Sequence, residues 1–584
     1  MKIRNFFLSA AALLMMVPAV AQTVWHNPLT EGEEPYVQGR AWNSEIGQTY
    51  HRFPDRAKDM VREAVWNLSL CSSGLLVDFF TNADKIVIRY NVKGNKNADN
   101  IPKFAKSGID IYRIDKDGVQ HWVSLFGHYN FGKTNSDQIV WTFDRLSPSD
   151  PKFGDEYKVY LPMYSEVENL EIGIPEGKVF RFAQNRKERP IVVYGTSIAM
   201  GASPSRNGNA WTNMLERRLD TPVINLAFSG NGKLEDEVFS LLSEIDARVY
   251  ILDCIPNMAG SLDSVLVRTV RGVKKLRSKN NAPIILADDM WYNYPNLHRM
   301  PEIYAKQKET YETLVSMGFK DIYYVTAEDF GFETDDYGDG SHPNDLGMKK
   351  YADAYEKILR DVLDMHPMEK FQPVRQRRDI VTYEWTDRHN AVLERNRTAD
   401  PEILLIGNSI THFWGGEPHV GNKWNGEDSF EKLFKGKRVT NMGYGWDRVE
   451  NVAWRMFNGE LDDCRPKHIF LMLGTNNMGI NSNSDIADGV VWTVKELRKR
   501  QPQARIHVEM IYPRSSQMVN VTQTNALIKS RLPIDSMIDV IDLTETLSLK
   551  GQPGVVDPDC FLADKLHPNA EGYRRIAKVL KKYL

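Results

Sequence analysis

The stretch Leu404-Leu405-Ile406-Gly407-Asn408-Ser409-Ile410 decides the fold of the C-terminal part of the chain. Its continuous apolar run is typical of a strand that is buried on both faces of a parallel sheet. The run ends at a small glycine, and Ser409 follows just beyond the carboxyl end of the strand, where open parallel sheets bind ligands. The alternative role for Ser409 is to cap the helix that follows.

The same pattern occurs earlier in the chain, as Tyr194-Gly195-Thr196-Ser197-Ile198 after the apolar run 190–193. Each copy also ends with Asp-x-x-His-Pro-Asn, at 339–344 and at 564–569. The landmarks occur in the same order at nearly equal spacing, which predicts a duplicated domain. Between them, apolar runs alternate with helical patterns, as expected of a parallel sheet covered by helices on both faces.

The late motif supplies the groups that a serine needs for nucleophilic catalysis. Asn569 is a good N-cap, so Asp564 and His567 are expected on the turn that enters a terminal helix. A serine hydroxyl is a poor nucleophile until a base takes its proton, and histidine titrates near neutrality. A carboxylate fixes the imidazole tautomer. A lone histidine on a loop is more often a surface residue, but Ser, Asp and His in this arrangement are much more specific.

The remaining segments have different patterns of polar and apolar residues. Residues 23–185 alternate polar and apolar positions, as in 85–90 and 108–113, and turn clusters separate the runs, which predicts an all-β sandwich. Residues 366–400 are rich in charge and proline, and we expect a linker with one short helix near Asp387 to Arg395. The predicted α/β domains are therefore 188–365 and 401–584.

The N-terminus has the three parts of a secretory signal peptide. Lys2 and Arg4 precede the apolar run 6–20, and Ala19-Val20-Ala21 offers a cleavage site. The apolar run is too short to span a bilayer comfortably, and no later stretch is long and apolar enough. Residues 1–21 are therefore predicted to be removed, and the mature protein is expected in the periplasm or outside the cell.

Composition excludes several classes of protein. The chain has 584 residues, 42% of them hydrophobic and 26% charged, which is an ordinary globular balance for several domains. Its net charge of −3 gives no electrostatic reason to expect nucleic acid as a partner. Four cysteines cannot form a disulfide framework. Pairing of Cys464 with Cys560 stays open.

Four ordered blocks of the C-terminal copy resemble those of the SGNH (GDSL) hydrolases. They are Ser409, Gly443 to Asp447, Gly474-Thr475-Asn476-Asn477 and Asp564-x-x-His567. The stretches 441–447, 454–456 and 458–461 are especially similar to the platelet-activating-factor acetylhydrolase branch. The resemblance implies a flavodoxin-like three-layer α/β/α fold. It also implies that Ser409 is the nucleophile, His567 the base, Asp564 its orienting carboxylate and Asn476 an oxyanion donor.

The C-terminal copy departs from the family pattern at two positions. Asn408 stands where the family has aspartate, and Trp446 stands where it has the oxyanion-hole glycine. The glycine acts through its backbone N–H, which tryptophan also has, but tryptophan is strained at a positive φ. Three outcomes stay open for this copy: slow turnover, a rearranged loop, or binding without turnover. Trp446 is equally a candidate wall of a sugar or aromatic subsite.

The first copy keeps every functional residue type. It resembles a divergent GDSL-like branch that uses Gly-Thr-Ser, and Gly108-Ile109-Asp110-Ile111-Tyr112 resembles the Gly-x-Asp-Leu-Tyr signature of the β-domain preceding that branch. The resemblance implies roles for the following residues: Ser197, Gly230, Asn257, Asp339 and His342. We expect this copy to be the more active one. Cys254 is expected to be a buried small hydrophobe.

Taken together, these features predict a secreted bacterial serine esterase that removes small acyl groups, with acetyl favoured, from an acylated glycan. The bacterial source follows from the resemblance alone, and the mechanism requires no metal or organic cofactor. Two alternatives remain: a lipid or lysophospholipid esterase, and a single catalytic domain served by a glycan-binding C-terminal copy. Six aromatic residues near the sites are candidates for substrate contact, although residues at such spacing are usually part of the core: Trp291, Tyr292, Tyr294, Phe413, Trp414 and Trp446.

Overall fold

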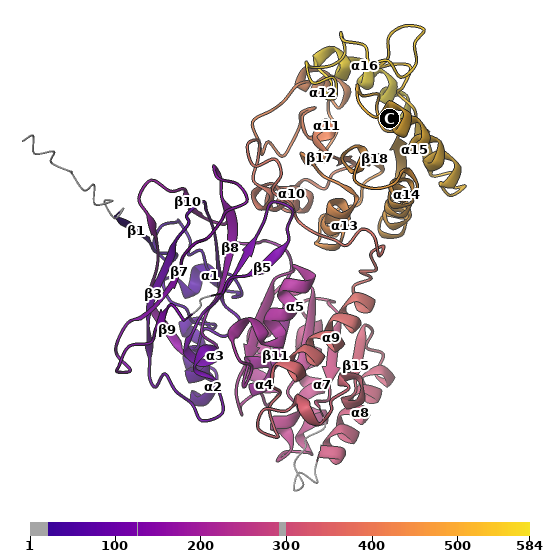
Figure 1. The fold of residues 1–584 in the computed structure, drawn as a ribbon. Coiled ribbons are helices and arrows are strands. Elements are labelled where there is room, and N and C mark those ends of the chain that lie inside the picture. Colours follow the sequence, from indigo (N-terminus) through magenta and orange to yellow (C-terminus); the bar gives the residue numbers. More distant parts are fainter. Residues whose placement is uncertain (1–21, 125–126, 291–299) are drawn as a thin grey trace, which may run out of the picture.

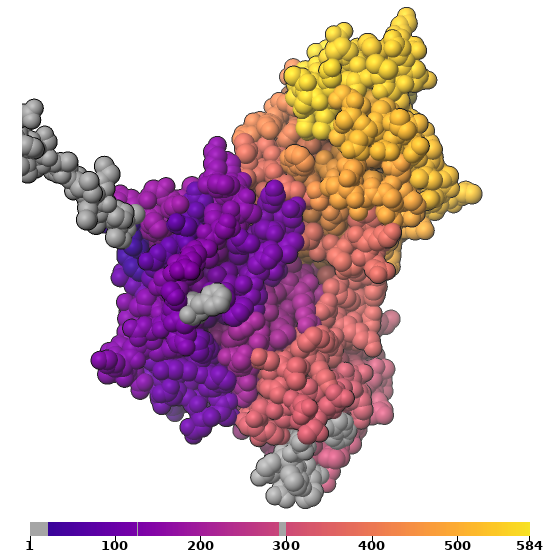
Figure 2. Space-filling view, in the orientation of Figure 1, coloured from indigo at the N-terminus to yellow at the C-terminus, as the bar shows by residue number. Residues whose placement is uncertain are grey.

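A computed structural model describes residues 22–124, 127–290 and 300–584 (Figure 1). The predicted signal peptide at 1–21 and the aromatic candidates Trp291, Tyr292 and Tyr294 lie outside the described residues. The chain forms an N-terminal β-sandwich and two α/β lobes, which we call the first and the second lobe. In Figure 2 the indigo and purple sandwich packs against the magenta first lobe, and the orange and yellow second lobe lies at one end of the molecule.

The N-terminal part is a sandwich of two antiparallel five-stranded sheets, with strand orders β1-β9-β3-β7-β6 and β10-β2-β8-β4-β5. Alternate residues of β3 are buried, so the predicted period of two is confirmed for 85–90. For 108–113 the predicted half-buried strand is wrong, because β4 is buried on both faces. Their side chains join those of the other sheet in one core, as two packed sheets require. The strands are β1 Thr23–His26, β2 Leu76–Thr81, β3 Ile86–Lys93, β4 Asp110–Ile114, β5 Gln120–Trp122, β6 Tyr129–Asn130, β7 Ile139–Phe143, β8 Asp155–Tyr160, β9 Glu166–Pro175 and β10 Phe180–Phe182. The helices beside them are α1 Asn43–Ile46, α2 Glu63–Ser69 and α3 Lys103–Ser107.

The first lobe has a five-stranded parallel sheet in the order β12-β11-β13-β14-β15. This is the flavodoxin-like order. Helices α5 and α9 cover one face of the sheet, and α6, α7 and α8 cover the other. The strands are β11 Ile191–Gly195, β12 Val223–Ala227, β13 Val249–Asp253, β14 Ile284–Ala287 and β15 Ile322–Val325. The helices are α4 Ser197–Met200, α5 Trp211–Leu219, α6 Asp236–Leu242, α7 Ser264–Arg277, α8 Met300–Ser316 and α9 Asp345–Val362.

The second lobe repeats this architecture, with the order β17-β16-β18-β19-β20. Helices α12 and α16 cover one face, and α13, α14 and α15 cover the other. The predicted duplication and three-layer fold are therefore confirmed. The strands are β16 Ile403–Gly407, β17 Val439–Gly443, β18 His468–Met472, β19 Arg505–Glu509 and β20 Ile538–Ile541. The helices are α11 Ser409–His412, α12 Glu427–Leu433, α13 Val449–Phe457, α14 Asn483–Arg500, α15 Met518–Arg531 and α16 Ala570–Leu580.

The segment between the lobes has one helix, α10 Trp385–Ala399, which is longer at both ends than the predicted 387–395. It starts where the side chain of Glu384 accepts a hydrogen bond from the Trp385 N–H. It stops at Asp400, which has a left-handed conformation immediately before Pro401. A residue before proline is disfavoured in the helical region, so the proline sets this end.

Largely buried ion pairs join the three parts, and we call this set the ionic seam. It consists of Glu156, Arg186, Glu188, Asp220, Arg375, His389 and Glu460. Arg375 contacts Asp220 of the first lobe at 2.7 Å and Glu156 of the sandwich at 3.2 Å. Because a charge left unpaired in the interior is costly, these contacts fix how the parts sit together.

Pairing of Cys464 with Cys560 does not occur, since all four cysteines are free thiols. The two residues pack in cores on opposite faces of the second sheet. Across the described ranges, the structure contains no helix with the length and apolar character needed to cross a bilayer.

Candidate active sites

Ser197 and Ser409 occupy the same place in the two lobes. Each is the first residue of a short helix, directly after the central strand β11 or β16. The glycines before them are needed for this turn, because a Cβ at Gly407 would lie 2.1 Å from Thr411 Oγ1 and one at Gly195 would lie 2.6 Å from Ala199 Cβ. The capping role considered for Ser409 is wrong. Asn408 is the N-cap, and its side chain accepts a hydrogen bond from Ile410 N at 2.9 Å.

The first lobe brings together Ser197, Asp339 and His342, which we call site 1. Ser197 Oγ lies 2.9 Å from His342 Nε2, and His342 Nδ1 lies 2.9 Å from Asp339 Oδ2. Asn344 caps α9 just after this turn. Burial raises the pKa of Asp339, but hydrogen bonds from Asn100 and His342 outweigh it and hold that pKa well below its usual range. The carboxyl group is therefore ionised beside the imidazole.

The second lobe brings together Ser409, Asp564 and His567, which we call site 2. Ser409 Oγ lies 2.8 Å from His567 Nε2, and His567 Nδ1 lies 2.7 Å from Asp564 Oδ2. Asn569 caps α16, as predicted. Burial opposes ionisation of Asp564, yet hydrogen bonds from the backbone and side chain of His567 lower its pKa. Both copies thus present a hydroxyl, a base and an ionised carboxylate in hydrogen-bonded series, which is the arrangement that activates a serine.

N–H groups that can hold an oxyanion lie beside each serine. Gly230 has φ of +68° and Trp446 has φ of +66°, so the two backbones follow the same path despite the different side chains. The strain expected of a tryptophan at this position is present, whereas a rearranged loop is not. In site 1, Asn257 Oδ1 accepts a hydrogen bond from Gly232 N at 3.2 Å, which leaves the amide hydrogens available. In site 2, Asn476 Nδ2 donates to Asp447 O at 2.9 Å.

The aromatic candidates separate into different environments. Trp446 is 51% exposed, whereas Trp414 is buried and stacks on Tyr573. Phe413 is also buried, but its ring centroid lies 5.3 Å from that of His567, so it forms part of the floor beside the imidazole. Cys254 is buried as predicted, and its thiol contacts Tyr194 O.

Comparison with known proteins places both lobes in one family. Residues 188–360 and 405–575 each match the GDSL-like lipase/acylhydrolase family, and residues 23–180 match the N-terminus of SGNH-hydrolase-type esterases. Platelet-activating factor acetylhydrolase IB subunit alpha2 from Bos taurus is 30% identical over 200 residues, covering 34% of this chain and 81% of that protein. A crystal structure described as that of a GDSL-like lipase from Bacteroides ovatus is 31% identical. It covers 59% of this chain and 98% of its own, with a TM-score of 0.52.

The chain belongs to the GDSL-like lipase/acylhydrolase family. It carries two such SGNH domains in tandem behind a GxDLY-type N-terminal domain. The family makes it an esterase-type hydrolase. Human platelet-activating factor acetylhydrolase IB subunit alpha1 is 27% identical over 209 residues, covering 34% of this chain and 82% of that protein.

In this GDSL-like chain the sandwich also reaches site 1, which the sequence did not predict. Asn100 Nδ2 donates to Asp339 Oδ2 at 3.0 Å, and Asn100 O accepts a hydrogen bond from Ser203 Oγ at 2.7 Å. The Tyr164 hydroxyl donates to Ser197 O at 3.0 Å. No motif marks these contacts, because they depend on how two separately folded parts dock.

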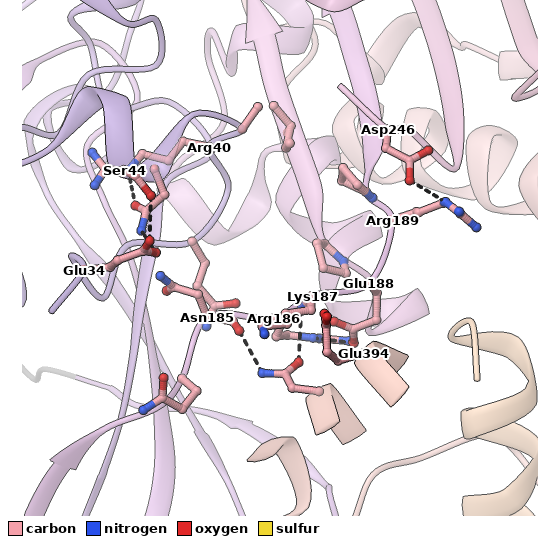
Figure 3. Close-up of a pocket in the computed structure, with 18 of the residues that line it drawn as sticks. Glu34, Arg40, Ser44, Asn185, Arg186, Lys187, Glu188, Arg189, Asp246 and Glu394 are labelled. Atoms are coloured by element: carbon pink, nitrogen blue, oxygen red, sulfur yellow. Dashed lines mark hydrogen bonds and ion pairs between the residues drawn. The ribbon is translucent and has the colours of Figure 1, made fainter. Parts of the chain in front are cut away.

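A cavity of about 1300 Å³ has none of the Ser, His or Asp residues of the two sites in its wall (Figure 3). Its wall includes Pro190, Pro222 and Asp246, which precede strands of the first lobe and so lie at the amino edge of that sheet. Arg189 pairs there with Asp246 at 2.8 Å. Ser197 lies at the opposite, carboxyl edge of this sheet. Among the described residues, no three His, Cys, Asp or Glu side chains converge as a metal site.

Proposed function

We propose that the protein is an exported serine esterase that removes small acyl groups, with acetyl favoured, from polysaccharides or oligosaccharides. The observation that carries this proposal is the pair of hydrogen-bonded Ser–His–Asp sets at the carboxyl edges of the two parallel sheets. The signal-peptide pattern at 1–21 supports export. The sandwich joined to site 1 supports a large substrate that extends beyond one lobe.

In site 1 each group has a defined role. Ser197 Oγ attacks the acyl carbon while His342 Nε2 takes its proton, and Asp339 stabilises the resulting imidazolium. The carbonyl oxygen becomes an oxyanion, which accepts hydrogen bonds from the N–H groups of Ser197 and Gly230 and from the Asn257 amide. As the intermediate collapses, the ester C–O bond breaks and His342 gives its proton to the leaving sugar oxygen, which departs as a hydroxyl. Water, deprotonated by His342, then attacks the acyl-enzyme and releases the acid.

Site 2 has the matching set, with Ser409 as nucleophile, His567 as base, Asp564 as orienting carboxylate and Asn476 as oxyanion donor. The exposed indole of Trp446 is suited to stacking on a sugar ring at this site. One further candidate function is lipid or lysophospholipid ester hydrolysis. The 30% identity to a platelet-activating factor acetylhydrolase subunit favours it.

Acetate release separates the two substrate classes. We expect the protein to release acetate from a panel of acetylated polysaccharides at least tenfold faster than it hydrolyses a lysophospholipid or a platelet-activating factor analogue. The Ser197→Ala/Ser409→Ala chain serves as the blank. Faster hydrolysis of the lipids would replace the glycan assignment with the lipid one.

Asn100→Ala is expected to slow site 1 alone. Losing a net hydrogen bond of about 1 kcal/mol to the Asp339 carboxylate lowers kcat about fivefold, with KM unchanged. The assay uses an aryl acetate and a chain carrying Ser409→Ala, so that only site 1 turns over. Asn95→Ala is the control, because Asn95 lies in the same loop and its side chain, among the residues that the structure describes, bonds only within that loop, accepting from Asn97 N. A similar loss at site 2, tested with Ser197→Ala, would contradict a local effect.

A further inference from the structure

The residues just before α10 wrap around the oxyanion loop of site 2. We call residues 374–384 the strap and residues 443–447 the oxyanion loop. The strap lies outside the 405–575 segment that matches the family. Its Arg378 Nη2 donates to Asn451 Oδ1 at 2.5 Å at the start of α13, and the carboxylate of Asp379 lies so close to Gly445 that a Cβ there would be 1.9 Å from Asp379 Oδ2. The strap therefore packs closely against the oxyanion loop and against the start of the helix that follows it.

Two buried strap side chains hold the carbonyl oxygen of Gly445. Gln376 Nε2 donates to it at 2.8 Å, and the Tyr383 hydroxyl donates to it at 2.9 Å. Gln376 is 1% exposed and Tyr383 is 7% exposed. The Gln376 amide is itself oriented, because its Oε1 accepts a hydrogen bond from Arg378 N at 2.6 Å. Both donors are thus fixed before substrate arrives.

The Gly445 carbonyl belongs to the same peptide group as the Trp446 N–H. A trans peptide is planar, so its C=O and N–H point in opposite directions. Holding the oxygen from behind therefore aims the N–H forward, toward the position of the oxyanion. Hydrogen bonds to the carbonyl also polarise the peptide and strengthen the N–H as a donor.

Site 1 holds the corresponding carbonyl from within its own loop. The corresponding carbonyl, of Ser229, accepts a hydrogen bond from the nearby Asn231 side chain at 2.9 Å, with no contact to the strap. Gly230 adopts its positive φ without steric cost, whereas Trp446 adopts nearly the same φ with a Cβ. The lobe that carries the strained residue is the one whose peptide is anchored from outside.

We propose that Gln376 and Tyr383 are positioning residues for the Trp446 N–H, so that the oxyanion hole of site 2 is completed by a segment outside its own lobe. This inference rests on the proposed function of site 2. Neither residue touches the substrate, and both act through the orientation of one peptide group.

The test uses full-length chains carrying Ser197→Ala, so that only site 2 reacts. Two readouts are followed: kcat and KM on p-nitrophenyl acetate, and the rate at which a fluorophosphonate phosphonylates Ser409, detected by intact mass. Gln376→Met and Tyr383→Phe are each expected to lower kcat and the phosphonylation rate about tenfold. The double variant should lower both about a hundredfold, approaching the loss of an oxyanion donor. KM should stay within about twofold.

Two controls distinguish a change in the orientation of the Trp446 N–H from a general loss of stability. Asn390→Leu removes two hydrogen bonds of α10, one donated to Asn185 O and one accepted from Lys187 N, without touching the oxyanion loop, and it should leave site 2 unchanged. The strap variants placed in a Ser409→Ala chain should leave the kinetics of site 1 unchanged. Tyr383→Phe removes one hydroxyl and keeps the ring, so thermal unfolding of this variant should remain cooperative.

Three results would overturn the proposal. The first is an unchanged site 2 kcat in the double strap variant. The second is an equal loss at site 1, which would show a global effect. The third is absence of phosphonylation of Ser409 in the Ser197→Ala parent. Esterase activity of the Ser409→Ala chain is measured separately, so the failure of site 2 and the failure of the proposed function of the protein are distinguished.

Discussion

Ser197→Ala is expected to remove most hydrolysis of aryl acetates and acetylated glycans, and Ser197→Ala with Ser409→Ala is expected to abolish it. Without the hydroxyl no acyl-enzyme forms, and the loss in kcat at the altered site should be on the order of a thousandfold or more. The Ser197–His342 and Ser409–His567 contacts of 2.9 Å and 2.8 Å make both sites sensitive to this change.

The measurement is the initial rate of acetate release by the parent, the two single variants and the double variant, side by side. Full activity of Ser197→Ala would overturn the ranking of site 1 above site 2. Equal losses in the two single variants would exclude a second lobe that only binds glycan. Thermal unfolding at unchanged temperature would show that each loss is chemical.

Asn257→Ala should have the next largest effect. Its amide oxygen accepts a hydrogen bond from Gly232 N at 3.2 Å, and in the proposed mechanism its N–H groups donate to the oxyanion. Removing one such donor costs on the order of 100- to 1000-fold in kcat, with little change in KM, because the charge exists only in the transition state. The Ser409→Ala chain isolates site 1 for this assay.

The matched control is Asn280→Ala. Asn280 also donates through its amide, to Tyr250 OH at 3.0 Å, but at the opposite edge of the same sheet. Its loss should leave kcat unchanged. A fall of less than threefold in Asn257→Ala would remove Asn257 from the oxyanion hole.

The sequence predicted the features that follow from local pattern and strand order. A serine that follows a strand of a parallel sheet lies at the carboxyl edge of that sheet, and the resemblance to SGNH hydrolases implied which Asp and His join it, so both sets of three could be named. Asn569 was recognisable as a helix cap because capping depends on neighbouring residues alone. The positive φ at Trp446 followed from the place of the family's glycine.

The contacts between parts could not be predicted in the same way. Asn100 reaches Asp339 across 239 positions, and Gln376 reaches Gly445 from a charged segment that reads as a linker. Neither residue lies in a motif. Their partners depend on how two folded surfaces dock, and a single sequence contains no periodicity or spacing that indicates this docking. The length of α10 was underestimated for a similar reason, since Trp385 and Asn396, which lie beyond the predicted ends, are held by tertiary contacts with Tyr444 and with Glu460 O.

The strap limits how the second lobe can be separated from the rest of the chain. The residue that precedes Gln376 is Arg375, which belongs to the ionic seam through Asp220 and Glu156. A C-terminal lobe cut at its family boundary would lose the strap that holds its oxyanion loop, and with it Arg375, which attaches the strap to the other two parts. The second lobe therefore cannot be exchanged for a homologous lobe at its family boundary without loss of these contacts. An exchange has to include the preceding thirty or so residues, or replace their contacts with others.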